Sequence, residues 1–125
     1  MNNNTSLKDE IIRFIDDEFD VKPEYPWQKT PDSAVFRHYS NKKWFAAILN
    51  VSAKHLGLEG DEIKEIIDLK SDEMLIEDLK KQNGYFPAYH MNKRHWITVL
   101  LDGSVPIDEI INLIKLSYVM TDNKK

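Results

Sequence analysis

A short stretch of the sequence, residues 89–96, combines aromatic, basic and imidazole side chains. It runs Tyr-His-Met-Asn-Lys-Arg-His-Trp. Aromatic rings offer flat surfaces on which nucleobases stack, and Lys and Arg side chains attract phosphate. Histidine adds a ring whose charge changes near neutral pH. We therefore interpret this stretch as part of a binding site rather than as a catalytic centre.

A second stretch, residues 27–54, has the same character. It holds five basic residues against one acid, a net charge of +4, although the whole chain carries −4. In residues 83–101 the only charged side chains are Lys93 and Arg94, and all four histidines lie in or beside these two stretches. Acids concentrate elsewhere, with net charges of −4 in residues 1–20 and −5 in residues 59–82. This segregation favours one basic, aromatic surface built from both stretches.

The candidate contacts to nucleic acid are of two chemical kinds, cations and rings. Cations would meet phosphates, while rings would contact bases or sugars. Two alternatives stay open: the tryptophans fill a small second core or a dimer interface, and the lysines form an ordinary solvated surface. The candidate binding residues are Arg37, His38, Lys42, Lys43, Trp44, His90, Asn92, Lys93, Arg94 and Trp96.

Catalytic and metal chemistry find little support. His90 and His95 are two potential zinc ligands, but a zinc site needs three or four and no third is evident nearby. Neither a nucleophile-elbow sequence nor a glycine-rich phosphate loop occurs, and the chain has no cysteine. We expect no catalytic residue, no metal and no cofactor.

Periodicity predicts the elements that position these residues. Apolar residues at three- and four-residue steps predict a helix from Leu7 to Phe19, with Ser6 and Asp9 placed like a capping box. A later helix is expected to be capped by Ser71, and a final one to begin near Pro106. Strands are predicted over residues 34–39, 43–52, 64–70, 85–90 and 95–101, the first two joined as a hairpin.

The resulting order, α-β(3)-α-β(2)-α, predicts an α+β fold: a two-layer sandwich with helices on one face of an antiparallel sheet and the other face open. Alternation along strands predicts that Trp44, Arg37, Trp96 and Thr98 point to the open face. The residues predicted to point to the helices are Phe45, Ala47, Leu49, Val51, Ile97, Val99 and Leu101.

Length and composition predict a single domain over residues 1–125, within the usual domain size. Residues 1–5 are polar and lack the apolar core of a signal peptide, and the longest apolar run, Trp44 to Leu49, is too short to cross a bilayer. With no cysteine, these features lead us to expect a cytoplasmic protein without a membrane partner.

Motifs along most of the chain resemble the MmcQ/YjbR family. They include Tyr25-Pro26-Trp27, Asn41-Lys42-Lys43-Trp44-Phe45 and, most specific of all, the run from Pro87 to Trp96. The resemblance implies a fold similar to CyaY (frataxin) and to secretion chaperones. It also implies the family's label of DNA-binding protein, which rests on a proposed double-wing arrangement, and it brings no established catalytic residues.

Three functions follow as hypotheses. The first is DNA binding through the basic, aromatic surface. The second is a non-enzymatic module that uses the open sheet for dimerisation or for docking a protein partner. The third is an uncharacterised small-ligand or enzymatic site around His90, Asn92, Lys93 and His95, which requires a pocket and a group with a perturbed pKa.

Overall fold

The first helix, α1 (Leu7–Phe19), begins where its sequence predicts. In this computed structural model, which describes residues 6–122, the Ser6 side chain accepts a hydrogen bond of 3.1 Å from the backbone N–H of Asp9. Ile11 and Ile15 are buried, and the helix ends at Asp20, whose φ of 57° is left-handed. The polar segment 1–5 lies outside the described residues.

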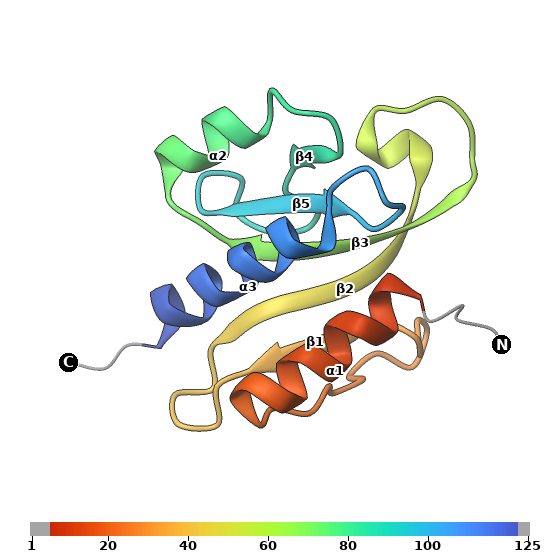
Figure 1. Cartoon of the computed structure of the whole chain (residues 1–125). Coiled ribbons are helices and arrows are strands. Elements are labelled where there is room, and N and C mark those ends of the chain that lie inside the picture. Colours follow the sequence, from red (N-terminus) through yellow and green to blue (C-terminus); the bar gives the residue numbers. More distant parts are fainter. Residues whose placement is uncertain (1–5, 123–125) are drawn as a thin grey trace, which may run out of the picture.

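Five strands form one antiparallel sheet in the order β1-β2-β3-β5-β4 (Figure 1). The predicted hairpin and third strand are confirmed, but the last two strands are shorter than predicted because the chain leaves the sheet after Pro87 and rejoins it at Trp96. A short 3-10 helix, η1 (Ala53–Leu56), follows β2. The strand bounds are β1 (Ala34–Arg37), β2 (Trp44–Ser52), β3 (Ile63–Lys70), β4 (Tyr85–Pro87) and β5 (Trp96–Leu100).

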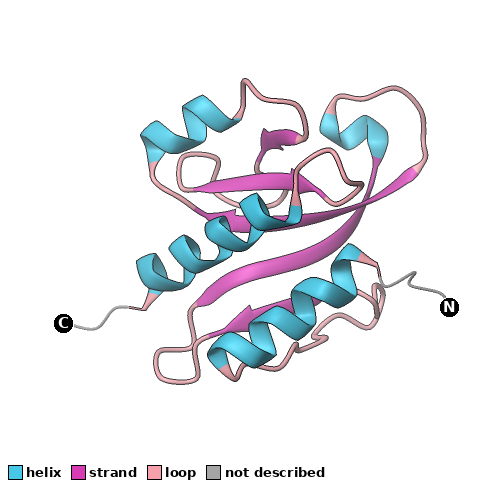
Figure 2. Cartoon of the chain, viewed as in Figure 1, coloured by secondary structure: helices cyan, strands magenta, loops and turns pink. Residues whose placement is uncertain are grey.

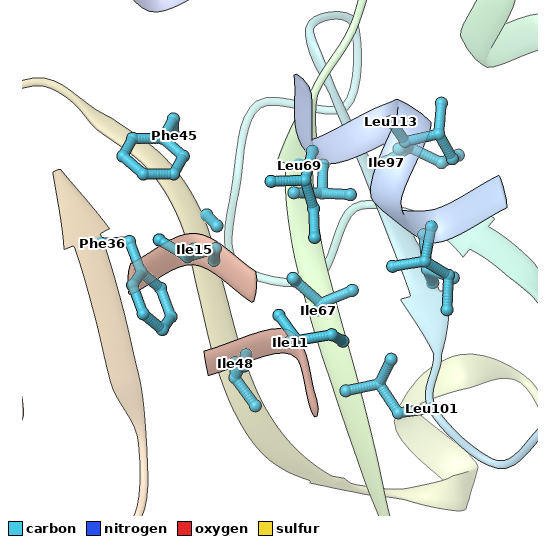
Figure 3. Packing of buried hydrophobic residues seen from close by; sticks show 14 of the residues in the cluster. Ile11, Ile15, Phe36, Phe45, Ile48, Ile67, Leu69, Ile97, Leu101 and Leu113 are labelled. Carbon is cyan, nitrogen blue, oxygen red and sulfur yellow. The ribbon is translucent and has the colours of Figure 1, made fainter. Parts of the chain in front are cut away.

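Helices α1 and α3 (Ile107–Thr121) lie over the same face of the sheet (Figure 2). Helix α2 (Glu73–Leu79) adds Ile76 and Leu79 to the same core. Its N-cap is Asp72, whose carboxylate accepts from the Leu75 N–H, so the predicted Ser71 cap is wrong by one residue. Figure 3 shows this core between helices and sheet, including Ile11, Phe36, Phe45, Ile67, Leu69 and Ile97. The α+β sandwich is confirmed.

A β-bulge at the start of β2 changes which side chains face the helices. Phe36 pairs with Ala46 and Arg37 with Trp44, so Phe45 is an extra residue without a partner on β1. Beyond this bulge the alternation is inverted. Ala46 and Ile48 join the helix-side core, and the prediction that Ala47, Leu49 and Val51 face the helices is wrong. Trp44 still points away from the helices, as predicted.

The opposite face of the sheet is not fully open. Side chains of β2, β3 and β5 form a second apolar cluster there, and η1 and the chain after β4 pack onto it. Its buried members are Val51, Leu56, Ile66 and Leu100, with Leu49, Phe86 and Tyr89 packed against them. Within the described part of the chain, no helix is both long and apolar enough to span a bilayer.

Candidate functional site

A cleft of about 500 Å³ opens on the face of the sheet away from α1 and α3. It is bounded by the segment between α1 and β1, by β2 and by the loop between β4 and β5. None of its described lining residues is acidic, and most of its lining is apolar or aromatic. The lining residues are Trp27, Lys29, Thr30, Ser33, Trp44, Leu49, Asn50, Tyr89, His90 and Met91.

Aromatic rings stand on both sides of the cleft. Trp27 and Trp44 contact each other edge to face, with ring centroids 5.9 Å apart and planes at 87°. On the other side, the Tyr89 and His90 rings lie 4.1 Å apart. The ring of Tyr89 also stacks on His55 at 5.8 Å, which fixes the tyrosine from behind. The cleft therefore presents rings held by neighbouring rings rather than freely rotating side chains.

A second cleft of about 420 Å³ adjoins the first and shares Tyr89 and His90 with it. Its other lining residues are His55, Leu56, Phe86, Pro87, Ala88 and Lys93. Tyr89 and His90 thus separate two hollows. Substitution at either residue would change both.

Internal hydrogen bonds shape the β4–β5 loop that carries these two rings. Lys93 Nζ donates to the Ala88 carbonyl at 2.8 Å, and Asn92 Oδ1 accepts from the Arg94 N–H at 2.8 Å. The Asn92 carbonyl accepts from the His95 N–H at 3.1 Å. His90 has a left-handed φ of 64°, which is uncommon for a residue with a Cβ. Asn92 and Lys93, predicted as contacts, therefore help to hold the loop in shape.

Beneath this loop lies a buried acid, Asp68, on the face of β3 opposite the helices. It has no solvent exposure, and its Oδ1 accepts a hydrogen bond from the Thr98 hydroxyl. Its other oxygen, Oδ2, has no hydrogen-bond partner among residues 6–122. Burial raises the pKa of Asp68 to about 7, despite the opposing effects of the Thr98 hydrogen bond and the charge of Lys93. Asp68 therefore titrates near neutral pH.

The predicted cations differ in how free they are. Arg37 is paired with Glu24 at 2.9 Å, and Arg94 with Glu73 at 2.6 Å. Lys42 and Lys43 lie in the exposed β1–β2 turn, and among the described residues neither side chain has an ion-pair partner. These lysines, with Lys29 at the cleft, are the cations most available to a phosphate.

Two predicted contacts lie away from the cleft. His38 is 3% exposed and belongs to the helix side, where its Nε2 lies 2.8 Å from Thr121 Oγ1 and its ring packs on Tyr118. Burial lowers the pKa of His38, and its enclosed position on the helix side gives it a structural role. Trp96 does face away from the helices, but it is half-buried beside Lys70, whose Nζ lies 6.0 Å from the ring centroid.

Of the lining residues of the cleft, Trp44 and His90 were predicted as contacts from the sequence, and the others were missed. Trp27 and Lys29 lie between helix and strand, where no periodicity assigns a direction to a side chain. Tyr89 lies within the aromatic stretch that composition singles out, but composition alone does not show that its ring lines the cleft. Asp68 also gave a signal, because it is the one acid in the otherwise apolar run from Ile66 to Leu69.

Metal binding gains no support from the described residues, which contain no group of three or more His, Asp or Glu side chains placed to hold an ion. In the cleft region, the rings of His55 and His90 instead each contact the ring of Tyr89. The site is thus an aromatic cleft with basic surroundings.

Comparison with known proteins places this geometry in a family. The YjbR family model matches residues 19–120. The chain is 38% identical to the uncharacterized protein YyaQ of Bacillus subtilis, covering 91% of the chain and 97% of that protein. The uncharacterized protein YjbR of Escherichia coli is 40% identical over 50% of the chain and 53% of its own length.

Solved structures agree with the fold. A crystal structure of a Pseudomonas syringae protein superposes with a TM-score of 0.87 at 44% identity, covering 97% of the chain and 99% of that structure. A Deinococcus radiodurans protein superposes with a TM-score of 0.71 at 26% identity, covering 99% of the chain and 84% of that structure. None of these proteins has a name that states an activity.

Proposed function

The chain belongs to the YjbR family, and we propose that it is a DNA-binding protein whose contact surface is the cleft face of the sheet. The observation that carries this proposal is the aromatic cleft itself, which is lined by Lys29 and by no described acid. Stacking surfaces combined with phosphate-seeking lysines are the usual components of a site that follows a nucleic-acid backbone.

The distribution of charge supports this orientation. The helices α1 and α3 begin with acids, Asp9 and Glu10 in one and Asp108 and Glu109 in the other. These helices cover the face opposite the cleft. An incoming polyanion would be repelled by the helix side and attracted to the cleft side, so the proposed contact needs no positive net charge on the whole chain.

The proposal is tested by fluorescence anisotropy with labelled DNA at two salt concentrations, about 50 and about 200 mM. If Lys29, Lys42 and Lys43 each meet a phosphate, affinity should fall about 20- to 40-fold across this interval. Absence of binding at micromolar protein, or binding that ignores salt, would contradict DNA binding as the function.

The volume of the cleft favours one second candidate, a planar small molecule. About 500 Å³ lies within the range of small-ligand pockets, roughly 300–1,000 Å³, and the lining is mainly apolar. Tyr89, His90 and Trp44 would then hold the ligand by stacking. A screen of planar compounds by tryptophan fluorescence separates the two functions, since salt-independent binding of a neutral compound without DNA binding supports this candidate.

A further inference from the structure

We infer that the cleft receives an unpaired nucleobase, so that the preferred ligand is single-stranded rather than duplex DNA. This inference rests on the proposed function and specifies its substrate. It follows from where the rings lie in relation to the cations.

Two rings of the cleft, Trp44 and Tyr89, are recessed, and Trp27 and His90 are exposed at its edge. Trp44 and Tyr89 are each only partly exposed, and with Leu49 they line a hollow between two loops over β2. A base within a duplex has both of its faces covered by neighbouring bases. Only an unpaired base, or one rotated out of the helix, can place its face against a ring in such a hollow.

Recognition of base edges in duplex DNA would need a protein surface of a different shape. Base edges in the major groove are reached by a protruding helix or two-stranded ribbon. Here the helices α1 and α3 occupy the opposite face, and the β4–β5 loop folds back on the sheet, where the Tyr89 N–H donates to Thr98 Oγ1 at 2.9 Å. The rings of Trp44 and Tyr89 therefore lie in a depression rather than on a projection.

The positive charges near the cleft are complementary to the phosphates on either side of one bound nucleotide. Lys29 lines the cleft, and the exposed Lys42 and Lys43 precede Trp44 in the sequence. A base held in the hollow would leave its phosphates outside, where Lys29 and the two lysines that precede Trp44 are the available cations. This complementarity to an anion distinguishes a nucleotide from a wholly apolar ligand.

The test compares three labelled probes by anisotropy at one salt concentration: an oligothymidine of about 12 nucleotides, a duplex of equal length, and a strand of equal charge with abasic sites. We expect the oligothymidine to bind about 5- to 140-fold more tightly than the abasic strand, the range that stacking of one base supplies. The duplex should bind more weakly than the oligothymidine.

Two variants locate the base. Trp44→Leu, which keeps apolar volume at the cleft, should weaken oligothymidine binding about 5- to 140-fold and leave abasic-strand binding unchanged. Trp96→Leu, a tryptophan on the same face that does not line the cleft, should bind both probes like the wild type. Thermal unfolding of both variants checks that each is folded, and the wild-type probe comparison stands without them.

The outcomes separate the two proposals. Equal affinity for all three probes, or tighter binding to the duplex, would overturn the unpaired-base inference while leaving DNA binding in place. No binding to any probe would overturn DNA binding, and the inference with it. Selective loss of affinity with the abasic strand and with Trp44→Leu supports both.

Discussion

Thr98 on β5 lies directly opposite Asp68 on β3, and its hydroxyl group donates a hydrogen bond to the buried carboxyl group of Asp68. The same hydroxyl oxygen accepts from the Tyr89 N–H at 2.9 Å. Thr98 therefore connects the buried acid to the loop that forms one side of the cleft. Through this connection, the ionisation of Asp68 can affect both the stability of the fold and the position of Tyr89.

Replacing Asp68 with Asn should remove a pH dependence of stability. The folded-state pKa of about 7 exceeds the ordinary value of 3.8, so between these values the folded protein holds a proton that the unfolded chain releases. Asp68 therefore stabilises the fold most below about pH 4. Between about pH 4 and about pH 7 its contribution to the free energy of unfolding falls by on the order of 4 kcal/mol. Asp68→Asn should be more stable than the wild type at about pH 8.

Urea unfolding at about pH 5 and about pH 8, followed by tryptophan fluorescence, measures this difference. Asp78→Asn, at an exposed acid on α2, is the matched control and should keep the wild-type pH dependence. If Asp68→Asn retains the wild-type dependence as well, Asp68 is not the group responsible.

Ser117 should contribute to stability by joining α3 to the sheet. Its buried hydroxyl donates to the carbonyl of Phe45 at 2.5 Å, at the β-bulge, and accepts from the Lys70 N–H at 2.9 Å. Ser117→Ala leaves these two backbone groups without a partner, which should lower the free energy of unfolding by about 1–3 kcal/mol. Ser40→Ala, at an exposed turn position, should change it by less than about 0.5 kcal/mol in the same urea titration. Equal effects would contradict this role for Ser117.

Reversing the charge of the β1–β2 turn should weaken DNA binding in a salt-dependent way. The double variant Lys42→Glu with Lys43→Glu removes two exposed cations, so the slope of log affinity against log salt should become shallower by about one per lost contact. Lys115→Glu, an exposed lysine on α3, reverses one charge on the opposite side and should leave the slope as it is. Equal slopes for the wild type and the double variant would exclude the turn from the contact.

The elements of the fold were predictable because their signals are local. The apolar period of α1 and the short polar turn before Trp44 each specify structure within a few residues. The bulge at Phe45 was not predictable, since it arises from how β2 pairs with β1. One extra residue there inverts the faces of Ala47 and Leu49, although strand bounds and sheet order are unaffected.

The part of the candidate site that was predictable also has a local sequence signal. The stretch that contains Tyr89 and His90 was recognisable by composition, and it does form one side of the cleft. Trp27 comes from a segment without periodicity, and only tertiary structure brings it against Trp44. His38 was misplaced because a charge-based reading of the sequence cannot show that α3 covers that ring.

The most direct test of DNA binding at the cleft uses the indole N–H signals of the three tryptophans in a two-dimensional NMR spectrum of ¹⁵N-labelled protein. On addition of oligothymidine, the signals of Trp27 and Trp44 should shift, while backbone signals of the exposed side of α3, such as Lys115, should not. Unchanged Trp27 and Trp44 signals at saturating DNA, or shifts confined to α1 and α3, would contradict the proposed site.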